Sequence, residues 1–476
     1  MRILLLIIAI ITFPLAAQQL HIDNTLPRLT VAGDTVDAHD GRIIRFEDTY
    51  YWYGTSYATT NGFTTANHYV VYSSPDMQSW TREGRLLPNQ PEGVYYRPHV
   101  IYNAATEQYV LWYNWYPQLW DGQFGVATSP TPTGPFTIVN DDVQMFRSEV
   151  GLGDFGLFVD ADSTAYISYN TIQNHQVSIE RLSDDYLSST QENGGIIAEH
   201  SEAGSQFKRD GKYYLLTDVT CCFCNYGSGA RVYVSDHPTE GYTLTTNINR
   251  YPGRSALALT DGVTTGTSYE TLVTNDTLPQ SLVALHPRPR QTDQLTLSLF
   301  TGNRPENCGD VSNPRVHPEI GTPEFTVSYW DFDHWREVDS LRVERNGTAL
   351  RQTLTMSFTP VTSTRIKLTP RPGYPFLAIY PTELSAGFAG AEDEVQVYVT
   401  GHNIPQPPVI PAQQAYVMEL PTAEGTEYIW MGDLWGSASD NVKGHDYPYW
   451  SAPLEFLEDG SVLPLEWTDT WSVDTE

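Results

Sequence analysis

The stretch TYYWYGTS at Thr49–Ser56, followed by YVVYSSPDMQSW at Tyr69–Trp80, decides the fold. The first run is rich in aromatic residues and indicates a β-strand, and the second indicates a partner strand that ends in a Ser- and Asp-rich turn. The same hairpin recurs four more times, with first strands at Glu107–Asn114, Thr164–Asn170, Lys212–Asp218 and Thr426–Asp433. A hairpin repeated five times is typical of the blades of a β-propeller.

The spacing of the repeats reveals an interruption. Tyr50, Tyr109, Tyr166 and Tyr213 follow one another at intervals of 47 to 59 residues, whereas Tyr428 comes 215 residues after Tyr213. Since one blade takes roughly 55 residues, about 160 residues are surplus, which predicts an inserted domain between the fourth and fifth blades. The Pro-rich segment 403–411 marks its exit.

The insert itself has the pattern of a β-sandwich. FTVSYWDFDHWREV at Phe325–Val338 and FTPVTSTRIKLTPRP at Phe358–Pro372 indicate strands with tight turns. Together with ALTDG at Ala258–Gly262, these stretches resemble the discoidin, or coagulation factor 5/8 type C, domain, which implies a jelly-roll sandwich. Such domains bind sugars at loop tips or act as plain spacers, and the sequence leaves both roles open.

The expected fold class is therefore all-β, a five-bladed β-propeller with an inserted jelly-roll β-sandwich. We divide the chain into a signal peptide (1–17), propeller blades 1–4 (18–250), the inserted discoidin-like sandwich (251–403), and blade 5 with ring closure (404–476). The signal peptide is predicted from a basic start, an apolar run at Ile3–Leu15 and the following Ala16-Ala17. An uncleaved anchor is the alternative, but the run is shorter than the ~20 residues that a span needs.

Charge and composition limit the partners and the compartment. The formal net charge of −30 repels nucleic acid and anionic membranes, so neither is expected as a partner. The signal peptide predicts a secreted or periplasmic protein. We expect a monomer that binds carbohydrate and needs no cofactor, with a structural Ca²⁺ left open. The four cysteines, Cys221, Cys222, Cys224 and Cys308, are interpreted as structural, because their spacing lacks a paired C-x-x-C signature, and their pairing stays open.

Three acids stand just ahead of the first strand of a blade. Asp40 lies in AHDGRIIRFEDTYYWYG, Asp154 in GDFGLFVDADSTAYISY and Glu202 in SEAGSQFKRDGKYYLL. A propeller gathers the starts of its innermost strands around one axis, so these side chains should meet at a common mouth. Hydrolysis of a glycosidic bond needs a proton donor at the leaving oxygen and a base or nucleophile. The three acids are therefore the candidate catalytic residues.

These three segments resemble the conserved blades of glycoside hydrolase family 43. Asp40 matches the first-blade motif Asp-Pro-x-Ile-Ile, with Gly41 in place of Pro. Asp154 matches the third-blade motif, in which the Pro is again missing and Ser163 stands where Gly is usual. Glu202 matches the fourth-blade motif Glu-Gly-Pro, with Ala203-Gly204 in place of Gly-Pro. The resemblance implies an inverting glycosidase in which Asp40 is the general base and Glu202 the general acid. Asp154 would keep Glu202 protonated and oriented, since a nearby carboxylate raises a pKa.

The last blade resembles the branch of that family related to 1,3-β-galactosidases. In that branch a Gln ahead of the last blade faces the substrate, and Gln413 matches it. The chain departs from the branch at two positions. The branch usually has Gly where Asp40 stands, and a Glu before Arg-Pro where this chain has Tyr96. A galactoside, an arabinofuranoside or a xyloside, at chain ends or side chains, therefore stays open as the substrate.

His39, Arg97, Trp115 and Gln413 are the candidate substrate-binding residues, and no metal ligand is predicted. Arg97 could hold a sugar hydroxyl or a site carboxylate, with a salt bridge between blades as the alternative. Trp115 lies beyond a strand end in LWYNWYPQLW and could stack on a sugar, with loop packing as the alternative. His39 is expected to hydrogen-bond beside Asp40. A non-catalytic carbohydrate-binding propeller is the alternative function.

Overall fold

The computed structural model describes residues 18–118, 120–147, 151–219, 222–223, 229–264, 268–274, 279–300, 323–348, 351–372, 378–390 and 394–475. Their regular structure is nearly all β-strand, with short 3-10 helices at Leu257–Leu259 and Lys443–His445. The predicted signal peptide, residues 1–17, lies outside the described residues, as do Cys221, Cys224 and Cys308. No helix in the described part of the chain is long and apolar enough to cross a membrane.

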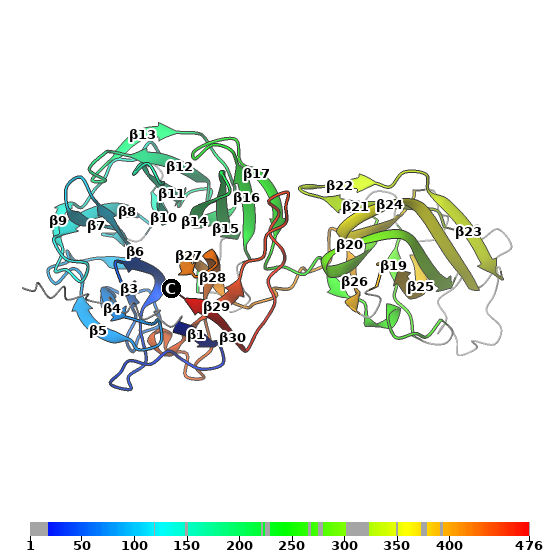
Figure 1. Cartoon of the computed structure of the whole chain (residues 1–476), viewed down its shortest axis with the longest axis horizontal. Helices are drawn as coiled ribbons and strands as arrows, with labels where there is room; N and C mark the ends of the chain where they lie inside the picture. Colours follow the sequence, from blue (N-terminus) through cyan, green and yellow to red (C-terminus); the bar gives the residue numbers. More distant parts are fainter. Residues whose placement is uncertain are drawn as a thin grey trace, which may run out of the picture.

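Five blades surround a central axis (Figure 1). Blade 1 consists of β2 (His39–Phe46), β3 (Thr49–Ser56), β4 (His68–Ser74) and β5 (Thr81–Arg85). Blade 2 consists of β6 (Val94–Asn103), β7 (Gln108–Tyr116), β8 (Gln123–Ser129) and β9 (Thr137–Asn140). Blade 3 consists of β10 (Leu152–Val159), β11 (Ala165–Thr171), β12 (Val177–Leu182) and β13 (Ser189–Asn193). Blade 4 consists of β14 (Ser201–Arg209), β15 (Lys212–Val219), β16 (Arg231–Ser235) and β17 (Thr243–Asn247).

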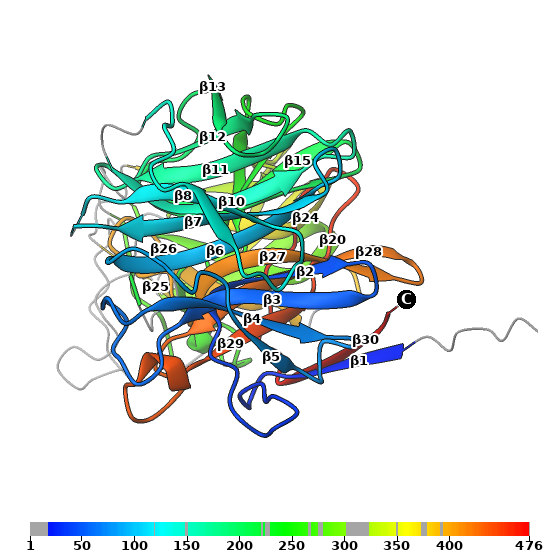
Figure 2. The ribbon, with the colours of Figure 1, turned by 90° about the vertical axis from the view of Figure 1, so that its left-hand side faces the viewer.

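Blade 5 is built from β27 (Gln413–Thr422), β28 (Gly425–Leu434) and β29 (Tyr447–Pro453). It is extended by two strands from the ends of the chain, β1 (Gln18–Asp23) and β30 (Thr470–Thr475), which pair antiparallel from Gln18↔Thr475 to Asp23↔Thr470. Figure 2 shows these two strands side by side. The first and last strands of the described chain are therefore joined within the ring.

The hydrophobic core of the propeller is divided among its blades. One buried cluster lies between each pair of neighbouring sheets, because alternate residues of every strand point to opposite faces. Between blades 5 and 1 the rings of Trp80, Trp52 and Trp450 pack edge to face, with centroids 5.3 Å apart at each step. The aromatic repeats of the sequence fill these inter-blade layers, and the predicted all-β, five-bladed fold is confirmed.

The insert forms a separate nine-stranded β-structure between β17 and β27. Its strands are β18 (Arg254–Ser255), β19 (Leu272–Val273), β20 (Ser281–Phe300), β21 (Phe325–Asp331), β22 (His334–Glu337), β23 (Arg342–Gly347), β24 (Arg351–Pro370), β25 (Ala378–Ala386) and β26 (Gln396–Thr400). Strands β20 and β24 pair over almost their whole length, with register shifts near Arg290 and Gln294. Their apolar residues enclose a core of their own, so the insert is a distinct module.

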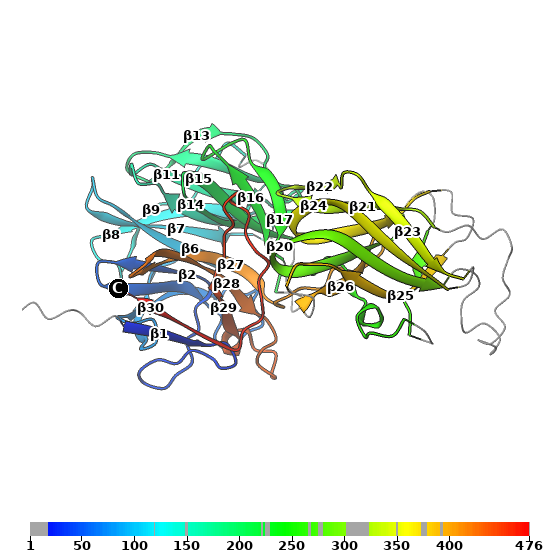
Figure 3. The same cartoon turned by 45° about the vertical axis from the view of Figure 1, so that its right-hand side comes forward.

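Two adjacent chain segments connect the modules. Arg250 and Pro408 form an antiparallel bridge, and the side chain of Asn249 accepts from the amide of Ile410 at 2.7 Å and donates to its carbonyl at 3.0 Å. The chain therefore leaves and re-enters the propeller at one place. The hairpin β21–β22 of the insert reaches toward β17 (Figures 1 and 3), and Phe332 at its tip packs against the core between blades 4 and 5.

Candidate active site

Each of the five innermost strands carries an irregularity near its first residues. The register of β2 shifts between His39 and Arg42, and equivalent shifts occur at the starts of β6, β10, β14 and β27. In each case the inner strand has one residue more than its partner strand over the same stretch, which is a β-bulge. A bulge redirects a side chain that would otherwise continue the alternation, here toward the axis of the ring.

One side chain from the start of each inner strand lines the same cavity, whose volume is about 410 Å³. These residues are Asp40 of blade 1, Arg97 of blade 2, Asp154 of blade 3, Glu202 of blade 4 and Gln413 of blade 5. The structure thus brings together the three predicted acids and two of the four predicted substrate-binding residues. A cavity with three carboxyl groups, a guanidinium and an amide can bind sugar hydroxyls and exchange protons with them.

Asp40 occupies a backbone conformation that bulky residues avoid, with φ at 52°. The next residue is Gly41, where a Cβ atom would stand 2.3 Å from Nε1 of Trp52 and 2.7 Å from the carbonyl oxygen of Ala38. A proline, the usual residue of the family motif, has a Cβ atom and would meet the same obstruction. Gly41 is therefore the residue that fits this bulge while Trp52 fills the inter-blade core.

Asp40 is buried and is held by one hydrogen bond to its carboxylate and one from its backbone. The hydroxyl of Tyr57 donates to Oδ2 of Asp40 at 2.5 Å, and the backbone amide of Asp40 donates to Oδ2 of Asp433 at 2.7 Å. Burial raises the pKa of Asp40 to about 6, with Asp433 adding to the rise and the charge of Arg97 opposing it. A carboxyl group with this pKa is ionised at neutral pH. Its pKa also lies near the operating pH, so it can accept a proton from water as a general base.

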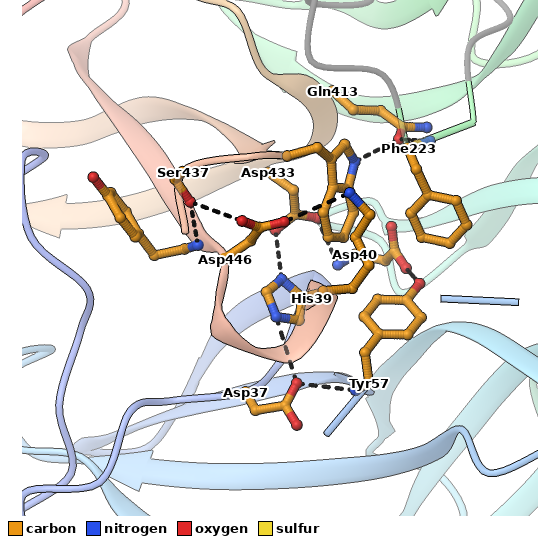
Figure 4. A network of polar contacts seen from close by, with 12 residues as sticks. Asp37, His39, Asp40, Tyr57, Phe223, Gln413, Asp433, Ser437 and Asp446 are labelled. Carbon is orange, nitrogen blue, oxygen red and sulfur yellow. Dashed lines mark hydrogen bonds and ion pairs between the residues drawn. The ribbon is translucent and has the colours of Figure 1, made fainter. Parts of the chain in front are cut away.

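His39 lies behind Asp40 and outside the cavity lining (Figure 4). Its ring is buried between two carboxylates, with Nε2 3.4 Å from Asp37 and Nδ1 3.4 Å from Asp433. Burial lowers the pKa of His39, but the contacts with Asp433 and Asp37 more than offset it and raise the pKa overall. The prediction that His39 binds substrate is wrong, because alternation along β2 turns its ring away from Asp40 toward blade 5.

Arg97 and Asp154 form an ion pair in the cavity wall. Nη2 of Arg97 is 2.8 Å from Oδ2 of Asp154, and the guanidinium also lies 3.4 Å from the carbonyl oxygen of Gln414. Because Arg97 belongs to blade 2 and Asp154 to blade 3, this contact both holds a site carboxylate and forms the salt bridge between blades that the sequence left as the alternative. The nearby carboxylates, Asp154 first, outweigh the effect of burial and raise the pKa of Arg97, so this cation is permanent.

Glu202 is oriented by the side-chain amide of Gln413. Nε2 of Gln413 lies 3.3 Å from Oε2 of Glu202. The amide oxygen of Gln413 accepts from Nε1 of Trp435 at 2.7 Å and from the backbone amide of Phe223 at 3.1 Å. Because two donors fix that oxygen, the NH₂ group must face Glu202. The other carboxyl oxygen, Oε1, lies 3.8 Å from Sγ of Cys222, which also lines the cavity.

Aromatic rings form most of the remaining wall of the cavity. Tyr57, Tyr96, Tyr116 and Phe223 surround it, with ring centroids between 5.5 and 6.3 Å apart in successive pairs. The hydroxyl of Tyr96 is buried without a hydrogen-bond partner in the described part of the chain. At the mouth of the cavity Phe63 and Trp120 are exposed by 51% and 66%, as expected of rings that stack on a ligand.

Trp115 does not reach this cavity. It is 7% exposed, stacks on Tyr95 at 5.9 Å and donates from Nε1 to the carbonyl oxygen of Asp141 at 2.7 Å. Its predicted substrate contact is therefore wrong. The alternation along β7 points Trp115 into the core between blades 1 and 2, and the neighbouring Tyr116 faces the cavity instead.

Three residues that hold Asp40 or Gln413 in place were not predicted from the sequence: Tyr57, Asp433 and Phe223. One signal could have identified Asp433. The last residues of each second strand lie opposite the bulge of the first strand, and Asp433 pairs with Gln413 in this way. Among the described residues, no three His, Cys, Asp or Glu side chains gather as a metal site would require.

Comparison with known proteins finds a family model that matches the part of the chain that holds blades 1–4. Residues 35–261 match the sequence model of Glycosyl hydrolases family 43. No protein with a curated description matches the chain. The matched region ends at residue 261, so the resemblance of the insert to discoidin domains stays a prediction.

Several solved structures share the fold. An exo-β-1,3-galactanase from Clostridium thermocellum superimposes with a TM-score of 0.53 at 18% identity, over 95% of this chain and 67% of that protein. A family 43 β-1,3-galactosidase solved with galactodeoxynojirimycin gives a TM-score of 0.52 at 17% identity, over 94% of this chain and 99% of that protein. A second family 43 β-1,3-galactosidase gives 0.53 at 17% identity, over 95% of this chain and 64% of that protein. The TM-scores show a shared fold, and at identities this low the likeness shows the fold alone.

Proposed function

We propose that this protein, whose residues 35–261 match the sequence model of Glycosyl hydrolases family 43, is an inverting glycosidase that releases single sugar units from the ends or side chains of an extracellular polysaccharide. One observation carries the proposal. Three carboxyl groups from three different blades line one cavity of about 410 Å³, whose walls are otherwise largely aromatic. A cavity of this kind suits a terminal sugar better than the interior of a chain.

In this proposal Asp40 is the base. Its carboxylate takes a proton from a water molecule as that water attacks the anomeric carbon, and Tyr57 stabilises the ionised form by donating a hydrogen bond. Arg97 adds a fixed positive charge that favours the same form. This arrangement gives the attacking water a proton acceptor on one side of the sugar ring.

Glu202 is the acid in the same proposal. It donates its proton to the leaving oxygen, while Gln413 holds its Oε2. Asp154 lines the same cavity and is anchored by Arg97 at 2.8 Å, so it can hold the substrate or Glu202 in place without moving itself. Since water and proton donor act from opposite faces, the anomeric configuration inverts.

A β-galactoside is the first substrate to test. The superimposable proteins named above act on β-1,3-linked galactose, and the contact between Gln413 and Glu202 agrees with the resemblance of blade 5 to that branch. Asp40 and Tyr96 depart from the branch, so we propose that this chain keeps the ordinary family base while its pocket accepts a terminal β-galactosyl unit with altered contacts at Tyr96.

We also propose that the protein acts outside the cytoplasm. Residues 1–17 support this proposal with a basic start, an apolar run and the small residues Ala16-Ala17 of a secretory signal.

Product analysis tests the proposed activity. The protein is incubated with β-1,3-galacto-oligosaccharides, arabinofuranosides and xylosides, and the anomer of the first product is followed by proton NMR. We expect single galactose units, released first as the α-anomer. Glu202→Gln and Asp40→Asn should each lower kcat by about 10²–10⁴-fold, the usual share of an acid or base, with an unchanged thermal unfolding curve. Binding of these sugars without any release by the wild-type protein would instead favour a non-catalytic propeller.

A further inference from the structure

A second groove lies between blade 4 and the insert. It has a volume of about 580 Å³ and is lined on the propeller side by β16, β17 and the segment that follows them, and on the other side by β20, β21, β22 and β24. In Figures 1 and 3 the hairpin β21–β22 stands next to β17 at this place. The site described above does not include any of the residues that line this groove.

The groove concentrates positive charge in a strongly acidic protein. Its lining contains Arg231, Arg250, Arg365 and Lys367, and Asp333 as its acidic side chain among the described residues. The carboxylate of Asp333 is already engaged, 2.6 Å from Nδ1 of its neighbour His334. The whole chain carries 27 Lys and Arg residues and a net charge of −30, so four cations around one groove contrast with the rest of the surface.

Two of these cations are partly withdrawn from water without a compensating charge. Burial lowers the pKa of Arg365 to about 10 and that of Lys367 to about 8, with no contribution from any carboxylate. Nε of Arg365 is buried with no hydrogen-bond partner among the described residues, and its Nη2 donates to Oγ1 of Thr246 at 3.3 Å. An unpaired buried cation is costly, and an anion in the groove would remove that cost.

Tryptophan rings stand beside the cations. Nζ of Lys367 lies 4.2 Å from the ring centroid of Trp335, and the guanidinium of Arg365 lies 5.7 Å from that of Trp330. The two indoles meet edge to face at 5.3 Å. Indole faces stack on the apolar faces of sugar rings, whereas fixed cations bind sulfate or carboxylate groups. The combination favours a sugar that carries an acidic group.

The groove opens on the same edge of blade 4 as the active site. Nη1 of Arg231 donates to Oγ of Ser201 at 2.8 Å, and Ser201 directly precedes Glu202. Ser201 pairs with Val219, and Arg231 pairs with Asn247, so the inner and outer strands end at a common edge. With strands ~4.8 Å apart, the three steps from β14 to β17 span about 14 Å. A polysaccharide chain of a few units could cross that distance.

We propose that this groove is a binding site for a sulfated or uronic acid-bearing segment of a polysaccharide, held by Arg365 and Lys367 and stacked on Trp335. Its connection to catalysis rests on the function proposed above: the acidic segment would lie here while a neighbouring end or branch of the same polymer enters the cavity at Glu202.

Binding is measured in the full-length Glu202→Gln protein, which should not hydrolyse the ligand. Titration calorimetry compares three oligosaccharides of equal length: a sulfated galactan, an oligogalacturonate and a neutral β-1,3-galactan. At least one acidic ligand should bind about tenfold more tightly than the neutral one, because one charge-assisted contact changes the dissociation constant by about that factor. The comparison between the two acidic ligands identifies the group that is recognised.

Lys367→Gln and Trp335→Ala should each weaken binding of that ligand about tenfold, as expected for loss of one charged or stacked contact. The matched control is Arg345→Gln, an exposed cation on β23 at the far end of the insert, which should leave binding unchanged. Thermal unfolding verifies that each variant is folded. If one groove variant does not fold, the binding affinity of the other groove variant tests the proposal.

Three results would overturn the proposal. The neutral galactan could bind as tightly as the acidic ligands. The two groove variants could retain full affinity. Inorganic sulfate could displace the ligand with equal affinity, which would mean an adventitious ion only. All three concern binding by an inactive variant, so they are distinguishable from failure of the wild-type protein to hydrolyse a galactoside.

Discussion

Asp40 owes its charge state to side chains that reach it from both sides. Burial and Asp433 raise its pKa, while Arg97 and the hydroxyl of Tyr57 lower it. The net pKa of about 6 is above the ordinary value of 3.8. A base must be ionised to act, so this residue should control the acidic side of the pH profile.

We predict that kcat/KM falls as the pH drops below about 6, because protonation of Asp40 removes the base. Tyr57→Phe deletes a hydrogen bond to the ionised form, so the pKa of Asp40 should rise and the acidic limb should move to higher pH by about one unit. Initial rates on an aryl glycoside between pH 4 and 8 give this limb. Tyr53→Phe is the control, since its hydroxyl binds the carbonyl oxygen of Pro132, away from the cavity. An acidic limb that stays in place in Tyr57→Phe would contradict the assignment of Asp40.

At the scale of single residues, the sequence predicts which residues belong to the site but not the direction in which each side chain points. Asp40, Asp154 and Glu202 could be located because each precedes an aromatic strand at a repeated distance. His39 and Trp115 were misplaced because they stand next to a cavity residue, and in a strand the adjacent side chain points to the opposite face. Asp433 and Tyr57 lie on strand ends that only the three-dimensional pairing brings to Asp40.

Among the elements, the bulged inner strands determine where the functional side chains point. All three family motifs lack their proline, and in two of them a glycine stands at its position in such a bulge. A Cβ atom at Gly204 would stand 1.2 Å from the carbonyl oxygen of Leu216, and one at Gly41 would meet Trp52. Both departures therefore follow from close backbone packing at the bulge, which the linear sequence does not reveal. The strands themselves were predictable, because a period of two is visible in each repeat.

Gly41→Ala should destabilise the protein by about 1–3 kcal/mol, the usual effect of overpacking, and should also lower kcat by displacing Asp40. Urea unfolding and initial rates measure the two effects. Gly401→Ala serves as control, because the nearest atom to its added Cβ would be the flexible Cγ of Gln280 at 3.3 Å. Equal stability of both variants would show that Trp52 yields easily and that the bulge is not sterically defined.

On the scale of the whole molecule, the insert is attached through a narrow connection. Its own core is separate from those of the propeller, and the chain leaves and returns at Arg250 and Pro408. Its further contacts with the propeller include the packing of Phe332 and the exposed ion pair of Arg288 with Glu455, at 2.9 Å. The interval between repeats predicted such a module, whereas nothing in the sequence indicated which blade it would face.

Replacing residues 253–405 by a short Gly-Ser linker should leave a folded propeller that hydrolyses a small aryl glycoside at a rate within about threefold of the full chain. Activity on an acidic polysaccharide should fall much further, because the second groove is lost. Calorimetric unfolding and rates on both substrates give the comparison. A matched Phe332→Ala variant removes the packing contact alone and should lower stability by about 3–5 kcal/mol at most. Loss of activity on both substrates in the shortened chain would mean that the propeller depends on the insert.

The pairing of β1 with β30 has a consequence for biosynthesis. A ribosome makes β1 before β30, so all the residues between the two strands must emerge before the two can meet. Until then blade 5 lacks its closing ribbon and the edge of β1 stays open, which is the kind of unpaired edge that promotes aggregation. If the polypeptide crosses a membrane as it is made, closure comes after translocation. A nascent chain that terminates before β30 would carry a permanently open ring, with the edge of β1 unpaired.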